Sequence, residues 1–148
     1  MKQYSHHFQV QAPLESVADF HQDSRALKGL TPPPLIVSFN KVEPLAEGSV
    51  VDFTMWMGPI PIHWVATHSE VDPLEGFTDT QTSGPFEVWV HRHSFESVDE
   101  GTTNVIDRVE AKPSDHPFWG IVSRFMWLTL PILFAYRSAQ TRRALERK

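Results

Sequence analysis

The 148-residue chain contains no cysteine. This absence excludes disulfide frameworks, thiolate zinc sites and cysteine nucleophiles. Basic residues are also few: the chain has 13 Lys and Arg and 18 Asp and Glu, which gives a net charge of −5. Domains that bind nucleic acid usually carry a basic stripe on the body of the fold. We therefore expect no nucleic-acid partner.

Two further patterns are missing. No apolar run follows the first residues, so the N-terminus does not resemble a secretory signal peptide, and we expect a cytoplasmic protein. The longest apolar stretch, residues 118–136, contains Arg124 and Pro131, which argue against a membrane-spanning helix. A weak membrane-surface contact stays open, because residues 137–148 carry a charge of +4 and residues 1–136 carry −9.

What the sequence does contain is typical of one folded domain over residues 1–148, with 41% hydrophobic and 21% charged residues. Most of it alternates between apolar and polar residues, the period of a β-strand. Short turns rich in Gly, Pro and Asp separate these segments, which predicts an antiparallel meander. The seven expected strands cover residues 4–10, 35–42, 49–57, 60–71, 77–83, 86–98 and 102–111.

The remaining segments have helical spacing. A short helix is expected over residues 13–21, and a second begins at Asp23 or Ser24 and ends before the prolines at 32–34. A long helix should run from Pro117 to about Glu146, capped by Ser114 or Asp115 and kinked at Pro131. Its first half is apolar on every side, so it should be covered on every side. We therefore predict an α+β fold in which a bent seven-stranded antiparallel sheet wraps around a long C-terminal helix.

Several motifs support this interpretation. The run Gly84-Pro85-Phe86-x-x-Trp89-x-His91-x-His93-x-Phe95 is followed by Gly101-Thr102 and Asp107-x-Val109, and is accompanied by Trp64, Phe77-x-Asp79-x-Gln81 and Phe134-Ala135-Tyr136-Arg137. This set resembles the bacterial ligand-binding SRPBCC domain proteins of the START-related superfamily. That superfamily also contains birch-pollen-allergen-like proteins, aromatic polyketide cyclases and lipid-transfer domains. The resemblance implies a helix-grip fold with a cavity between the sheet and the last helix.

The last hairpin carries the sharpest candidate for chemistry. If residues 99–101 form a three-residue loop with Gly101 in the left-handed conformation, His93 lies opposite Asp107. The pair has two interpretations. The imidazole could be a general base oriented by the carboxylate, as in a cyclase or dehydratase, or the pair could be a hydrogen bond that only stabilises the sheet. We favour the second interpretation.

A metal site is a further alternative, because His91, His93 and Asp107 offer two imidazoles and a carboxylate on one face. Histidines at i and i+2 often share a face without binding metal, so we predict no metal and no other cofactor. Likewise, no glycine-rich phosphate loop and no serine nucleophile elbow occurs in the sequence, which gives no support to nucleotide hydrolysis or acyl transfer.

Aromatic and sulfur-containing side chains gather on the strand faces that the resemblance places around a cavity. We predict that the protein binds a small hydrophobic or aromatic molecule there. Alternatives are the enzyme using His93 with Asp107, and a homodimer or membrane-surface module formed through the apolar last helix. The expected ligand-binding residues are Phe53, Met55, Trp64, Phe77, Gln81, Trp89, His91, His93, Phe95, Asp107 and Phe125.

Overall fold

A computed structural model describes residues 1–146. Arg147 and Lys148, part of the basic C-terminal segment, lie outside the described residues. The helices are α1 (Leu14–Gln22), the short 3-10 helix η1 (Ser24–Lys28), α2 (Pro117–Leu128) and α3 (Leu130–Leu145). The strands are β1 (Lys2–Val10), β2 (Ile36–Val42), β3 (Val50–Met57), β4 (Ile60–Asp72), β5 (Gly76–Ser83), β6 (Phe86–Asp99) and β7 (Thr102–Pro113).

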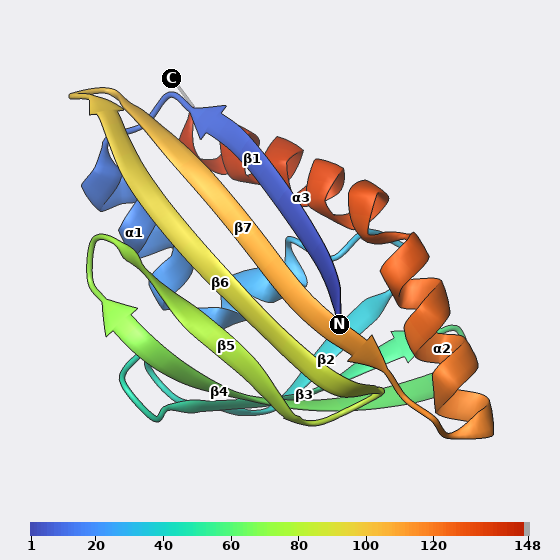
Figure 1. Ribbon diagram of the computed structural model, residues 1–148. Helices are drawn as coiled ribbons and strands as arrows, with labels where there is room; N and C mark the ends of the chain where they lie inside the picture. The colour runs from blue at the N-terminus through green and yellow to red at the C-terminus, as the bar shows by residue number, and fades with distance from the viewer. Residues whose placement is uncertain (147–148) are drawn as a thin grey trace.

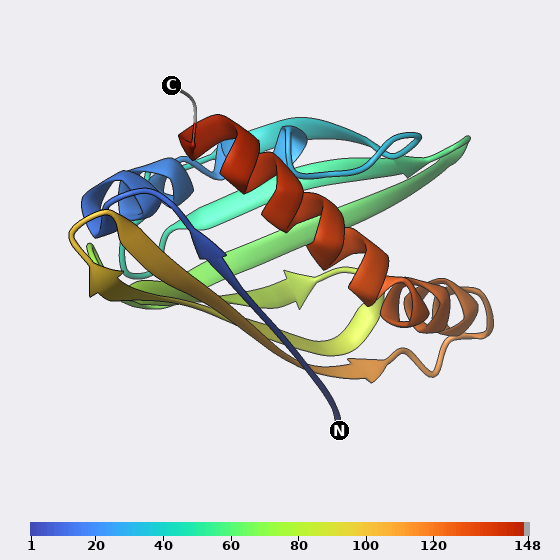
Figure 2. The ribbon, with the colours of Figure 1, turned by 90° about the horizontal axis from the view of Figure 1, so that it is seen from above.

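The strands form one antiparallel sheet in the order β1-β7-β6-β5-β4-β3-β2. The sheet bends strongly, and α3 lies across its concave side while α1 and α2 lie at opposite ends of the molecule (Figures 1 and 2). This arrangement confirms the predicted α+β helix-grip fold. All seven strands match the expected segments closely, because short turns delimit them in the sequence.

The hairpin of β6 and β7 has the predicted register over the candidate site, with His93 opposite Asp107 and His91 opposite Val109. The predicted loop is wrong in detail. Asp99 pairs with Thr102 after an irregularity in β6, and Gly101 is not left-handed. The Asp99 side chain instead accepts a hydrogen bond from the Gly101 N–H at 2.9 Å, which closes the turn without a left-handed residue.

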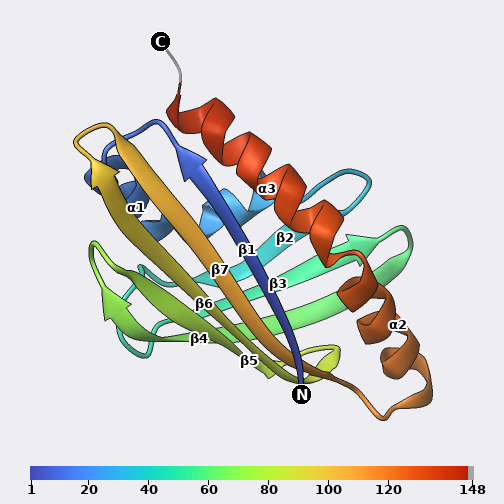
Figure 3. The same ribbon diagram turned by 45° about the horizontal axis from the view of Figure 1, so that its top comes forward.

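The C-terminal helix is not continuous, contrary to prediction. It breaks at Thr129, and α2 and α3 are bent by 53° relative to one another (Figure 3). Pro131 lies in the first turn of α3, where its missing N–H costs nothing, and the Thr129 N–H closes α2 on the Phe125 and Met126 carbonyls. The predicted bend near Pro131 is therefore confirmed, but it is a break between two helices.

The start of α2 also differs from expectation. Neither Ser114 nor Asp115 caps it; the Nδ1 atom of His116 accepts hydrogen bonds from the N–H groups of Phe118 at 3.1 Å and Trp119 at 3.3 Å. Within residues 1–146, no single helix has the length and apolar composition of a membrane span, although α2 and α3 taken together do.

Two hydrophobic clusters lie on the concave side of the sheet. The larger one joins β2, β3, β4, β6, β7 and α3, with Phe134 and Leu130 fully buried at its centre. The smaller one packs α1 against β1, β6 and β7 through residues such as Val17, Phe95 and Val105. The candidate residues His91, His93 and Asp107 lie on β6 and β7, the strands that both clusters share.

Gly76 offers a test of the close packing between β5 and β6. It has a φ of 134°, and an added Cβ would lie 1.9 Å from the His93 carbonyl oxygen. We predict that Gly76→Ala lowers the free energy of unfolding by more than about 2 kcal/mol in chemical denaturation, since it adds a backbone clash to strain. Gly48→Ala is the control, because Gly48 also has positive φ but has no neighbour within 4 Å, and it should cost only about 1 kcal/mol. Equal losses for the two variants would contradict this packing.

Candidate functional site

A cavity of about 530 Å³ lies between the concave face of the sheet and the helices η1, α2 and α3. Its walls are mainly apolar and include Phe53 and Met55 of β3, Trp64 of β4, and Leu130 and Leu133 of α3. The segment between η1 and β2, with its three prolines, contributes another wall. The cavity is large enough for a small organic molecule, in the size range typical of ligand sites.

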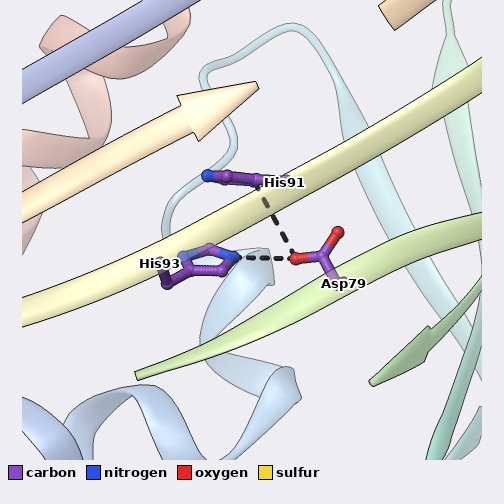
Figure 4. A group of neighbouring side chains, drawn as sticks. All are labelled: Asp79, His91 and His93. Atoms are coloured by element: carbon purple, nitrogen blue, oxygen red, sulfur yellow. Dashed lines mark hydrogen bonds and ion pairs between the residues drawn. The ribbon is translucent and has the colours of Figure 1, made fainter. Parts of the chain in front are cut away.

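Polar groups gather at one place on the cavity wall, where β5 and β6 pair (Figure 4). The His93 Nε2 atom lies 2.7 Å from Asp79 Oδ2, and the His91 Nδ1 atom lies 3.8 Å from the same oxygen. Behind the rings, Asp107 Oδ1 lies 2.9 Å from His91 Nε2 and 3.3 Å from His93 Nδ1. We call Asp79, His91, His93 and Asp107 the His–Asp cluster.

The cluster forms because three strands bring alternate residues to one face. Asp79 pairs with His91 between β5 and β6, and His93 pairs with Asp107 between β6 and β7. The centroids of the two imidazole rings lie 3.8 Å apart with the rings tilted by 31°, and Phe77 stacks on His93 at 4.4 Å. Each ring is therefore held between a carboxylate on either side and an aromatic neighbour, which fixes its orientation.

The surroundings of His91 and His93 shift the pKa values of the two side chains in opposite directions. Burial opposes a charge on His93, but hydrogen bonds to Asp107 and Asp79 outweigh it and raise the pKa of His93 to about 9. Burial and the charge on His93 lower the pKa of His91. Burial also opposes the charges of Asp79 and Asp107, but their bonds to the histidines keep both carboxyl pKa values below the ordinary range. At neutral pH, His93 is an imidazolium and His91 is neutral.

Other ionisable groups surround the cavity. Arg137 of α3 lines it and donates from Nε to the Leu30 carbonyl at 3.3 Å, while its guanidinium lies 5.5 Å from the Phe134 ring. His21 of α1 also lines it, with its ring centroid 6.4 Å from that of His93, and burial lowers the pKa of His21 to about 4 despite its bond to the Val17 carbonyl. Positive charge from Arg137 and His93 can thus compensate the two carboxylates of the His–Asp cluster.

The structure brings eight of the eleven predicted ligand-binding residues to the cavity wall. Gln81, Phe95 and Asp107 lie elsewhere. The side-chain amide of Gln81 donates a hydrogen bond to the Phe86 carbonyl and accepts one from the Phe86 N–H, and these two bonds hold the β5–β6 turn. Phe95 packs under α1, and Asp107 lies behind the two histidines. The eight are Phe53, Met55, Trp64, Phe77, Trp89, His91, His93 and Phe125.

Sequence reasoning missed Asp79 as the second carboxylate of the cluster. Asp79 has the same parity as Phe77 in β5, so the alternation did place it on the inner face. Its partner could not be identified, because the β5–β6 register is set by the turn around Gly84 and Pro85 and not by a recognisable hairpin sequence. Arg137 and His21 were missed because the way that α1 and α3 pack on the sheet is a tertiary property.

The expectation that the first half of the C-terminal helix is covered on every side is wrong. Five apolar residues of α2 and α3 pack on the larger core cluster: Trp119, Met126, Trp127, Leu130 and Leu133. An apolar stripe stays exposed, consisting of Phe118, Ile121, Phe125, Leu128 and Ile132.

Comparisons with known proteins agree on the fold. No protein-family model matches the sequence, and no curated protein matches it. Among solved structures, a protein from Chromobacterium violaceum is 14% identical over 100% of both chains, with a TM-score of 0.79. The Zhui aromatase/cyclase from Streptomyces sp. R1128 is 15% identical over 97% of this chain and 90% of its own, with a TM-score of 0.65. Ara h 8.0201 is 13% identical over 95% of this chain and 97% of its own, with a TM-score of 0.66.

Identities this low show the fold alone. The chain has the helix-grip fold that the resemblance in its motifs predicted.

The shifted pKa values of His93 and His21 predict how the stability of the protein depends on pH. Because the pKa of His93 rises to about 9, its contribution to stability is complete below pH 6.5 and is lost as the pH rises through about 9. The pKa of His21 falls to about 4, so its contribution is complete above pH 6.5 and is lost as the pH falls toward 4. Imidazole NMR titration should find one histidine that titrates near pH 9 and another near pH 4.

Site-specific variants assign these titrations. His93→Gln should remove the resonance that titrates near pH 9 and should flatten the loss of stability between pH 6.5 and 9. A titration of His93 near its ordinary value would contradict the ion-paired cluster.

Proposed function

We propose that this protein binds a small apolar molecule, aliphatic or aromatic, that carries one polar group. The observation that supports this most is the division of the cavity wall, which is apolar over β3, β4 and α3 and polar at the His–Asp cluster. A ligand whose polar group faces His93 or Arg137 would form hydrogen bonds with these side chains. Its apolar part would be buried among Trp64, Met55 and Leu133.

The apolar part of the cavity wall would supply most of the free energy of ligand binding, and the polar part would set the orientation of the ligand. Burial of apolar surface contributes about 25 cal/mol per Å² and has no direction. Hydrogen bonds to charged groups contribute roughly 1.5–3 kcal/mol and require defined geometry. We infer that an oxygen-containing group, such as a hydroxyl, carbonyl or carboxylate, enters first and lies against the His–Asp cluster.

A fluorescent probe tests the proposed binding site. N-Phenyl-1-naphthylamine, whose emission rises in apolar surroundings, should bind the wild-type protein in the cavity. We predict that Leu133→Trp, which places a larger side chain in the cavity, weakens binding at least tenfold, because about 1.4 kcal/mol corresponds to that factor.

The matched control is Val98→Trp, which adds the same side chain at an exposed position on β6. It should leave the affinity unchanged. If both variants bind the probe as well as the wild-type protein does, the probe occupies the exposed stripe of α2 or another surface, and the cavity proposal is wrong.

One observation favours a second candidate, a cyclase or dehydratase. A neutral His91 and a protonated His93 side by side provide a base and an acid in one cavity, and such separated pKa values are common in acid–base catalysis. With His93 protonated at neutral pH, its role would be that of an acid and not the base first considered. The helix-grip fold of the Zhui aromatase/cyclase is compatible with this candidate.

Turnover of poly-β-ketone substrates separates the candidates. Lost turnover in a folded His93→Gln variant would support the enzyme, whereas an inactive wild-type protein that binds the probe would support ligand binding alone. One domain over residues 1–148, a cytoplasmic location and a homodimer or weak membrane contact through the apolar C-terminal helices stay predictions from the sequence.

A further inference from the structure

Contrary to the expectation from the sequence that no metal binds, we propose that Asp79, His91 and His93 bind one divalent transition-metal ion, of the Zn²⁺ or Co²⁺ type, at the polar end of the cavity. The inference goes beyond the apolar ligand of the proposed function and does not depend on it, since the site consists of side chains already held in place. Two imidazoles and one carboxylate are ligands that such ions prefer.

One oxygen atom of Asp79 contacts a nitrogen atom of each histidine (Figure 4). One atom from each of the three residues lies within 4.8 Å of the other two. Asp79 Oδ2 is 2.7 Å from His93 Nε2 and 3.8 Å from His91 Nδ1. Bonds of about 2.0–2.1 Å in a tetrahedral site separate two ligands by roughly 3.3–3.4 Å. One of the two distances is shorter than this value and the other is longer, so the imidazole rings would rotate as the ion binds.

Asp107 orients the rings for this role. Its Oδ1 atom lies 2.9 Å from His91 Nε2 and 3.3 Å from His93 Nδ1, on the side of the rings away from Asp79. A carboxylate that accepts the N–H of a histidine fixes which nitrogen keeps its lone pair, and makes that nitrogen a better metal ligand. Here it would leave His91 Nδ1 and His93 Nε2 as the ligand atoms, both on the Asp79 side.

The charges and protons also balance. Asp79 and Asp107 carry two negative charges, which a divalent ion would neutralise with both histidines in the neutral state. Binding displaces the proton that His93 shares with Asp79, and this proton passes to the solvent. Three protein ligands leave a coordination position that faces the cavity, where water or an oxygen atom of a bound molecule could complete the site.

Cobalt chloride alone is the probe, because Co²⁺ bound to histidine in a site of low coordination number absorbs visible light. We expect one Co²⁺ per chain, displaced by Zn²⁺, with the release of about one proton near pH 7 as measured by calorimetry in two buffers. Asp79→Asn and His93→Gln should each weaken binding at least tenfold. Asp107→Asn should weaken it about 10- to 100-fold while leaving one ion bound per chain.

His63→Gln is the control, since His63 also pairs with an aspartate, Asp52 at 2.6 Å, but on an exposed part of the sheet. It should bind Co²⁺ as the wild-type protein does. Binding that is equal in all variants would assign the ion to surface histidines and overturn the proposal, as would the lack of 1:1 binding at millimolar Co²⁺.

An NMR measurement on the wild-type protein tests the proposal even if the variants fail to fold. Bound Co²⁺ should shift the NMR signals of His91, His93 and the nearby Trp89 ring before those of the exposed His63 and His116. Shifts confined to the latter two residues would overturn the proposal.

Discussion

One buried and one partly buried carboxylate within one sheet are the constraint on which the rest of the site depends. Asp79 and Asp107 lie on different strands, and removing an ionised carboxylate from water costs several kcal/mol unless it is paired. His91 and His93 lie between them on β6. His93 lies 2.7 Å from Asp79 and 3.3 Å from Asp107, and His91 bonds to Asp107 at 2.9 Å and lies 3.8 Å from Asp79. A shift of one residue in either register would turn one partner to the opposite face and leave a buried charge unpaired. The His–Asp cluster therefore ties β5, β6 and β7 to one register.

The same constraint explains why the cavity is polar at one end and apolar elsewhere. The bent sheet cannot be filled completely by α3, because the chain breaks at Thr129 and α2 turns away at 53° toward one end of the sheet. The apolar side chains of α3 and β3 form walls around the remaining space, and the cluster occupies the place where β5 and β6 meet. A molecule in this cavity contacts a rigid, charged surface on one side and adaptable apolar groups on the others.

The sequence predicted most of the fold and part of the site. Strand alternation and turn residues identified all seven strands, and the symmetric hairpin of β6 and β7 placed His93 opposite Asp107. The break at Thr129 was missed because a proline in an apolar run is compatible with either a kink or two helices. Asp79, Arg137 and His21 were missed because they join the site through the β5–β6 register and helix packing, which no local pattern encodes.

The most direct test of this account is to locate a bound molecule relative to the cluster. Intermolecular NOEs should be measured between 2-naphthol, an aromatic molecule with one hydroxyl, and the side chains of the labelled protein. The account predicts NOEs from the ring protons to Trp64, Met55 and Leu133, and from the protons next to the hydroxyl to His91 or His93. NOEs only to Ile121 and Leu128, on the exposed stripe of α2, would contradict it.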